Sequence, residues 1–298
     1  MMANLKYSFF IFLGACSYGI LASIVKLGLQ AGHSVPELTG SQYLIGLLLL
    51  LLSFPFIKRT KITFKQAAAL LLTGASLSLT GILYGMSLDR NPASIAVVLL
   101  FQFTWIGILF EALYERKMPS KAKIISAILL IIGTVFASNL INSGSHAIQA
   151  DGLIYGLLSA VTFAVFIFAS GKAGKGIPTI QRSIFITFGG LLLVGAVSGP
   201  VLISGGIQLG GLWKFGILMS LFGAIFPIVF FAIGSPHLDS GLATIVGSAE
   251  LPAAVAAAML ILGERISEAQ TFGIALILIG ISLPQFSFKK AAKNRVST

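Results

Sequence analysis

Long apolar blocks separated by short polar breaks run through the whole chain. Ten blocks can be distinguished, at roughly residues 8–29, 38–57, 67–88, 93–114, 122–141, 152–171, 180–204, 213–234, 241–263 and 270–287. Each is close to the ~20 apolar residues that an α-helix needs to cross the ~30 Å hydrocarbon core of a bilayer. A membrane β-barrel would show shorter segments of alternating polarity. The pattern predicts an all-α integral membrane protein with ten transmembrane helices.

Composition and charge support this class and suggest an orientation. The chain is 56% hydrophobic and only 10% charged, whereas about a quarter of a soluble domain is charged. With a cytoplasmic N-terminus, every Lys and Arg falls on the cytoplasmic side except Lys26, Arg90, Lys214 and Arg265. Basic residues concentrate in cytoplasmic loops, so the net charge of +11 reflects topology and not a nucleic-acid partner. We expect a multi-pass membrane protein with both termini in the cytoplasm.

The longest polar break lies in the middle of the chain and divides it into two halves. This break reads NSGSHAIQAD, residues 142–151. It separates five apolar blocks from five more, so we predict one five-helix repeat over residues 1–143 and a second over 144–298, the second ending in a short basic tail. Five is an odd number of crossings, so the second repeat would enter the membrane from the opposite side. Inverted repeats of this kind are common in secondary transporters.

Local sequence matches between the halves support the repeat. The fourth block ends FEALYERKMPSK and the ninth ends MLILGERISEAQ, which aligns Glu115-Arg116 with Glu264-Arg265. The following blocks read SAILLIIG and GIALILIG, with small residues at the same seven-residue spacing. In this alignment the counterpart of Glu250 is Phe101.

These motifs resemble the EamA family of the drug/metabolite transporter superfamily. The most specific match is AELPAAVAAAMLILGERISEAQTFGIALILIGI in the second half, with a fainter copy, LLFQFTWIGILFEALYERKMPSK, in the first. The resemblance implies a ten-helix inner-membrane transporter of small organic solutes, often an exporter of amino acids or other metabolites. The small four-span multidrug relatives carry a glutamate in their first helix. The first block here has none, so that coupling carboxylate cannot be carried over.

Glu250 is the candidate of greatest interest because it lies deep within the ninth block. It stands ten residues into that block, roughly 15 Å along a helix, and a charge at such a depth usually faces a cavity or a partner. Pro252 follows and should free the carbonyl of Ser248, because proline has no N–H and its ring crowds the preceding turn. Glu250 could bind a substrate ammonium group, carry a coupling proton, or, as a protonated carboxyl, only pin a neighbouring helix.

Other polar residues could complete a central site. Gln102 and Trp105 in the fourth block lie beside the residue aligned with Glu250; an amide can donate and accept hydrogen bonds, and an indole can stack or contact a cation. Ser17 and Tyr18 in the first block and Tyr84 in the third are weaker candidates, and Tyr84 would equally suit the interfacial aromatic belt.

Two charged residues in apolar blocks have simpler interpretations. Glu111, near the cytoplasmic end of the fourth block, should pair with Arg116 about one turn away. Arg182, at the start of the seventh block, should extend its side chain to the membrane interface, with an anion ligand as the alternative role.

Enzymatic chemistry finds little support. His33, His146 and His237 all fall in polar breaks without metal-ligand spacing. There is no phosphate-binding loop for ATP hydrolysis, and the single cysteine excludes an internal disulfide. We therefore expect no cofactor and no catalytic residues.

The sequence predicts a secondary active transporter of small polar or zwitterionic solutes that works by alternating access, with protons as a candidate coupling ion through Glu250. The alternatives are a passive facilitator or channel, and a membrane enzyme acting on a lipid-linked substrate.

Overall fold

The computed structural model describes residues 2–53, 56, 60–91, 93–137, 149–205, 210–263 and 267–296. These residues form helices and short connections, and they contain no strand. The elements are α1 (Met2–Gln30), α2 (Val35–Ser53), α3 (Phe64–Arg90), α4 (Ala93–Leu100), α5 (Phe103–Glu115), α6 (Lys121–Ala137), α7 (Ala150–Lys172), α8 (Thr179–Gly205), α9 (Leu212–Ser220), η3 (Leu221–Ile225), α10 (Phe226–Gly234), η4 (Ser235–His237), α11 (Ser240–Gly247), α12 (Glu250–Leu262) and α13 (Glu268–Val296).

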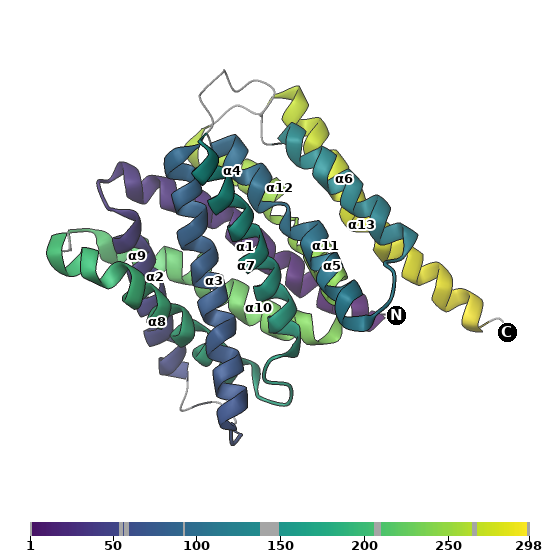
Figure 1. Ribbon diagram of the computed structural model, residues 1–298, viewed down its shortest axis with the longest axis horizontal. Coiled ribbons are helices and arrows are strands. Elements are labelled where there is room, and N and C mark those ends of the chain that lie inside the picture. Colours follow the sequence, from purple (N-terminus) through teal and green to yellow (C-terminus); the bar gives the residue numbers. More distant parts are fainter. Residues whose placement is uncertain are drawn as a thin grey trace.

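The helices form a bundle in which most apolar blocks are long enough to cross a membrane (Figure 1). Among the described residues, eight segments meet the length and hydropathy that a span requires. The remaining two predicted spans correspond to α6, which has 17 residues, and to the apolar part of α13, Glu268–Pro284. The all-helical membrane class is confirmed. The number ten stays a prediction, because α6 and the apolar part of α13 are shorter than the eight spans.

The last three helices of each half begin at positions that differ by a constant offset of 147 residues. The starts of α4, α5 and α6 at positions 93, 103 and 121 correspond to those of α11, α12 and α13 at 240, 250 and 268. Even the left-handed residues that end α5 and α12 correspond, Arg116 with φ 53° and Gly263 with φ 70°. The alignment of the Glu-Arg pairs, which requires an offset of 149, is therefore wrong, and the counterpart of Glu250 is Phe103, not Phe101.

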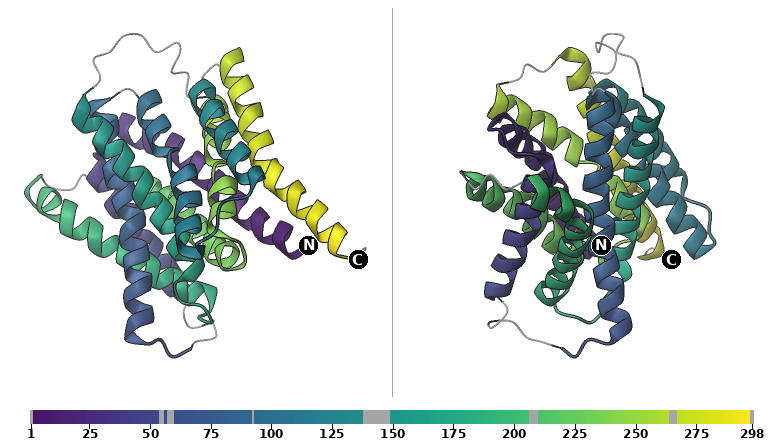
Figure 2. Two further views of the ribbon diagram at one scale, coloured as in Figure 1. Left: turned by 45° about the vertical axis from the view of Figure 1, so that its right-hand side comes forward. Right: turned by 60° about the vertical axis from the view of Figure 1, so that its left-hand side comes forward.

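The offset places equivalent helices against each other in opposite directions. Ser126 on α6 donates a 2.6 Å hydrogen bond to the carbonyl of Gly280 on α13. Gly133, further along α6, lies against the carbonyl of Gly273, which comes earlier in α13. Ser126 corresponds to Gly273, and Gly133 to Gly280, so a two-fold rotation exchanges the two contacts. The antiparallel pairing of α6 with α13 (Figures 1 and 2) is the relation that an inverted repeat produces.

The largest helix contacts in the rest of the bundle follow the same two-fold symmetry, and the half-helices depart from it. The packing of α1 against α10 and α12 corresponds to that of α7 against α3 and α5, and α2 packs against its counterpart α8. In contrast, α5 packs closely against α11, whereas the symmetry-related pair, α12 and α4, has no comparable packing among the described residues. The fourth apolar block consists of the half-helices α4 and α5, and the ninth of α11 and α12. The pair α5 and α11, at one end of the bundle, is therefore packed more closely than the pair α4 and α12 at the other end.

The eighth apolar block contains a distortion that other helices stabilise. A π-helical turn, η3, joins α9 to α10 just before Pro227, which cannot donate to the carbonyl of Gly223. Gln42 on α2 donates to that carbonyl instead at 2.8 Å. Ser17 on α1 donates to the neighbouring carbonyl of Phe222, also at 2.8 Å. Freed backbone groups within a membrane need partners of this kind.

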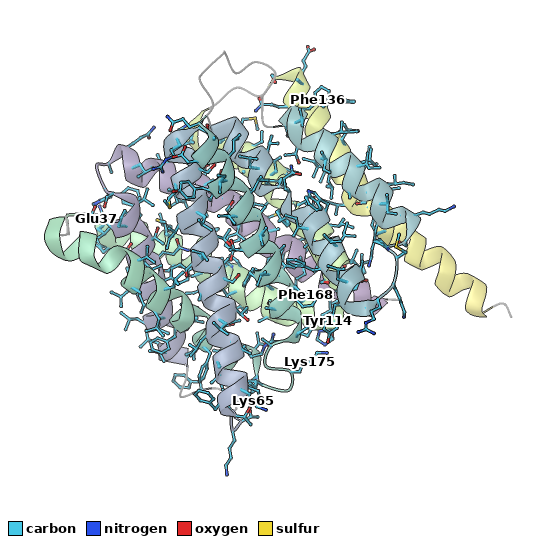
Figure 3. The ribbon with its side chains drawn as sticks, viewed as in Figure 1. Glu37, Lys65, Tyr114, Phe136, Phe168 and Lys175 are labelled. Atoms are coloured by element: carbon cyan, nitrogen blue, oxygen red, sulfur yellow. The ribbon has the colours of Figure 1, made fainter. Side chains whose placement is uncertain are left out.

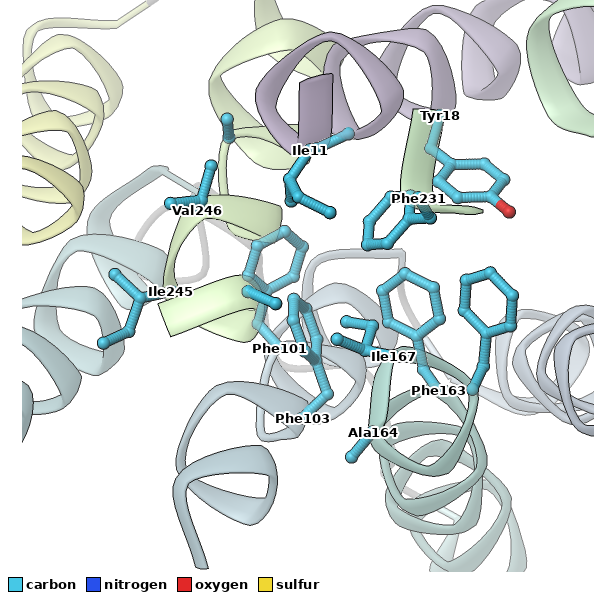
Figure 4. Packing of buried hydrophobic residues seen from close by; sticks show 14 of the residues in the cluster. Ile11, Tyr18, Phe101, Phe103, Phe163, Ala164, Ile167, Phe231, Ile245 and Val246 are labelled. Atoms are coloured by element: carbon cyan, nitrogen blue, oxygen red, sulfur yellow. The ribbon is translucent and has the colours of Figure 1, made fainter. Parts of the chain in front are cut away.

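An aromatic core lies where the half-helices meet α1, α7 and α10 (Figure 4). Phe103 contacts Phe163 edge-to-face with ring centroids 4.8 Å apart. Phe166 and Phe231 are fully buried. Tyr18 lies at the margin of the cluster, and its hydroxyl points away from Phe101 and Phe103 (Figure 4).

Candidate functional site

Glu250 lies at an interruption in the ninth apolar block. The helix stops at Gly247 and resumes with Glu250 as the first residue of α12, while Ser248 and Ala249 form the joint. One carboxylate oxygen of Glu250, Oε2, is buried and has no hydrogen-bond partner. An unpaired buried polar group of this kind calls for an explanation, since most such groups find a partner. A helix N-terminus also favours a negative charge.

The effect of Pro252 differs from the sequence prediction. The carbonyl of Ser248 is not left free, because it accepts a tighter, three-residue hydrogen bond from the N–H of Leu251 at 3.3 Å. The hydroxyl of Ser248 in turn donates to the carbonyl of Thr244 at 3.2 Å. The carbonyl of Ser248 therefore has a backbone partner despite Pro252. The polar group left without a partner at this joint is the side chain of Glu250.

Two tyrosines lie near Glu250. Tyr18 on α1 and Tyr84 on α3 are within range of the charge on its carboxylate, although no hydrogen bond joins either of them to it among the described residues. The hydroxyl of Tyr18 is also buried without a hydrogen-bond partner. Close approach of α1 to α12 is possible because Gly19 lies directly against the backbone at Glu250 and Ala254, where a Cβ atom would come within 2.6 Å of the Ala254 nitrogen. Glu250, Tyr18 and Tyr84 therefore form one polar group, which we call the central triad.

Gln102 and Trp105 form a separate pair. The side-chain amide of Gln102 donates to the carbonyl of Val98 at 2.8 Å and accepts from the Trp105 indole at 2.8 Å. Trp105 is 41% exposed, on the outside of the bundle. Both ends of the amide are thus used to stabilise the break between α4 and α5.

Ser17 neighbours Tyr18 but its hydroxyl is already engaged. It donates to the carbonyl of Phe222 in the π-helical turn. In this conformation the Ser17 hydroxyl therefore stabilises the π-helical turn and is not available to a solute.

An ion cluster that the sequence reasoning missed lies at the opposite end of α5 and α11. The ammonium group of Lys123 on α6 contacts both carboxylate oxygens of Glu111, at 2.8 and 2.7 Å, and Oδ1 of Asp239 at 2.7 Å. Asp239 also caps α11 by accepting from the N–H of Leu242 at 2.7 Å. Glu111 further accepts from the N–H of Gly241 at 3.2 Å. We call Glu111, Lys123 and Asp239 the ion cluster.

The predicted pairing of Glu111 with Arg116 is wrong. Arg116 ends α5 in the left-handed conformation, and Glu111 pairs across the bundle with Lys123 instead. The sequence did contain a sign of this pairing, because a lysine inside an apolar block needs a partner, and Lys123 lies within the fifth block as the third residue of α6.

The interfacial prediction for Arg182 is also wrong, because this side chain is only 4% exposed. Its guanidinium donates to the carbonyls of Ala232 and Ser170 at 2.9 and 2.6 Å. Pro236 has no N–H to donate to the carbonyl of Ala232, so Arg182 compensates for that proline as Gln42 does for Pro227.

No group of three His, Cys, Asp or Glu side chains among the described residues is arranged to hold a metal ion. Of the three histidines, His146 lies outside the described residues. His33 is buried and packs edge-to-face on Phe215 with ring centroids 5.6 Å apart.

Comparisons with known proteins agree with the two-repeat architecture. The model of the EamA-like transporter family matches twice, over residues 5–139 and 150–284. A solved crystal structure shares the fold with a TM-score of 0.72 over 95% of this chain and 97% of its own, at 18% sequence identity. A search of curated proteins gave no match. The predicted boundary between residues 143 and 144 falls outside the described residues and stays a prediction. With both halves matched, the chain belongs to the EamA-like transporter family, and is a multi-pass membrane transporter.

Proposed function

We propose that this transporter moves small solutes bearing an ammonium group, such as amino acids, by alternating access around the central triad. The observation that carries the proposal is the unpaired Oε2 of Glu250 beside Tyr18 and Tyr84. A carboxylate is a natural partner for a solute ammonium, and charge-assisted hydrogen bonds are stronger than neutral ones. The two phenol groups add hydrogen-bond donors, and the neighbouring Phe cluster supplies an apolar wall.

The location of the central triad fits such a role. Transporter sites lie near mid-membrane where interrupted helices of the two repeats meet. Glu250 begins α12 at the break in one repeat, and its counterpart Phe103 begins α5 at the break in the other. The symmetric backbone thus presents one charged and one apolar side chain, which suits a solute with one charged end.

The asymmetry between the two ends of the half-helices supports alternating access. The end where α5 packs on α11 carries the ion cluster and lies with Tyr114 and Lys175, toward the side we predict to be cytoplasmic (Figure 3). The opposite end, between α4 and α12, is packed less closely among the described residues. This arrangement is what a conformation closed to the cytoplasm and open to the outside would show.

Three finer parts of the proposal rest on the sequence. These are outward transport, location in the inner (plasma) membrane with cytoplasmic termini, and proton coupling through Glu250. A facilitator without energy coupling is the second candidate, and it would use the same central triad. No observation favours a membrane enzyme.

Counterflow in proteoliposomes tests the proposal. Vesicles preloaded with one unlabelled amino acid at a time should accumulate the same labelled amino acid transiently, because a carrier exchanges solute across the membrane and a channel does not. A panel of proteinogenic amino acids, each compared with its deaminated carboxylic acid, tests the need for an ammonium group. Equal counterflow of an amino acid and its deaminated analogue would refute the ammonium-binding role of Glu250, and absence of counterflow throughout the panel would refute this substrate class.

A further inference from the structure

A cavity that is not lined by the central triad lies toward the end of the bundle that we predict to face the cytoplasm. Its volume is about 520 Å³, and its walls come from the start of α1, the loop between α7 and α8, the start of α8 and the end of α10. The charged side chains in its lining are Lys6, Lys175 and Arg182, and no acidic residue of the described chain lines it. The proposed transport function does not use this cavity.

We propose that this basic cavity binds a phosphate-bearing anion, such as the headgroup of an anionic lipid. Lys6 and Lys175 are exposed and free to turn toward a ligand. Arg182 adds a third positive charge to the lining; its side chain is buried, and its Nε has no hydrogen-bond partner. Three positive charges without an acidic neighbour favour an anion of more than one charge-bearing oxygen.

The local backbone and the aromatic wall suit the same ligand. Thr179 begins the long helix α8 at the rim of the cavity, so the positive end of that helix faces the same space. Tyr7 and His237 stack in parallel with ring centroids 3.7 Å apart and form a flat wall. An excess of lysines in cytoplasmic loops follows from membrane topology alone, but topology does not account for a cavity with a buried, incompletely paired arginine.

Thermal stability of the purified, delipidated full-length protein tests this site. Addition of phosphatidylglycerol, or of inorganic phosphate, should raise the melting temperature, whereas phosphatidylcholine, or chloride at equal ionic strength, should not. A response to phosphatidylglycerol alone identifies a lipid headgroup, and a response to inorganic phosphate identifies a free anion. No increase with either anion would overturn the proposal.

A matched pair of double variants locates the effect. Lys6→Gln with Lys175→Gln removes two charges from the cavity and should weaken the apparent affinity for the effective anion about tenfold or more. Lys65→Gln with Lys121→Gln removes two exposed charges outside the cavity and should leave the affinity unchanged. Equal weakening in the two double variants would mean a general surface-charge effect and would overturn the site. All four lysines are exposed, so the fold should tolerate these changes.

Discussion

Lys123 on α6 contacts Asp239 at the start of α11, with 2.7 Å between Nζ and Oδ1, and the same ammonium group contacts Glu111 on α5. One lysine therefore ties together three elements drawn from both repeats. Its side chain is almost fully buried, so these contacts are shielded from solvent. We therefore expect their loss to disturb the packing of the helices more than the loss of a surface ion pair would.

Loss of Lys123 should open the cytoplasmic end of the bundle. Lys123→Met leaves the carboxylates of Glu111 and Asp239 facing each other without a cation, which should separate α5 from α11. Labelling of a cysteine introduced at Ala243, in a Cys16→Ala background, by a membrane-impermeant thiol reagent should increase several-fold when the reagent is on the cytoplasmic side.

The ion pair between Arg90 and Asp151 provides the control for this experiment. It joins α3 to α7 at 2.6 Å, but its side chains are 31% and 53% exposed. Arg90→Gln should therefore change labelling at position 243 little. If Lys123→Met and Arg90→Gln gave the same labelling rate, the ion cluster would not close this end.

The contact between α6 and α13 should tolerate a methyl group at one glycine and not at another. A Cβ added to Gly273 would meet the backbone of Ala137 and lie 2.6 Å from the carbonyl oxygen of Gly133, whereas one added to Gly280 would have 3.3 Å to its nearest neighbours. Gly273→Ala should lower the melting temperature by several degrees, and Gly280→Ala by much less. The reverse order would contradict the packing of these helices.

Gln42 and Pro227 should be thermodynamically coupled. Gln42→Leu leaves the carbonyl of Gly223 without its donor, which should cost about 1–3 kcal/mol of stability. In a Pro227→Ala background the restored N–H offers a replacement donor, so the same change should cost less. A double-mutant cycle measures the difference, and purely additive effects would show that the two residues do not share this carbonyl.

Proton coupling through Glu250 makes a prediction of its own. Glu250→Gln keeps the shape of the side chain but can no longer gain or lose a proton. In proteoliposomes, a pH gradient should drive accumulation of solute by the native protein but not by this variant, while exchange at equal pH reports whether the variant remains competent for transport. Accumulation that stayed fully driven by the pH gradient in Glu250→Gln would rule out this residue as the coupling group.

The sequence predicted the helical membrane class, the two repeats and Glu250 as a deep polar residue, because hydropathy and repeated small residues are local signals. It misplaced the repeat register by two residues, because it aligned the two Glu-Arg pairs, whereas the helix starts and the left-handed residues Arg116 and Gly263 correspond at an offset of 147. It also missed the ion cluster, since Lys123 and Asp239 are distant in sequence and meet only through packing. Gln102 was assigned to the site because it lies beside the residue aligned with Glu250, but its amide is hydrogen-bonded within the helix break itself.

The central claim is that Glu250 binds the ammonium group of the solute. The most direct test is the binding affinity of the best amino acid from the counterflow panel, measured by thermal shift for the native protein, Glu250→Gln and the exposed control Glu115→Gln. We expect Glu250→Gln to weaken binding of the amino acid at least about tenfold, the equivalent of ~1.4 kcal/mol, while Glu115→Gln retains near-native affinity. Unchanged affinity in Glu250→Gln would contradict this claim.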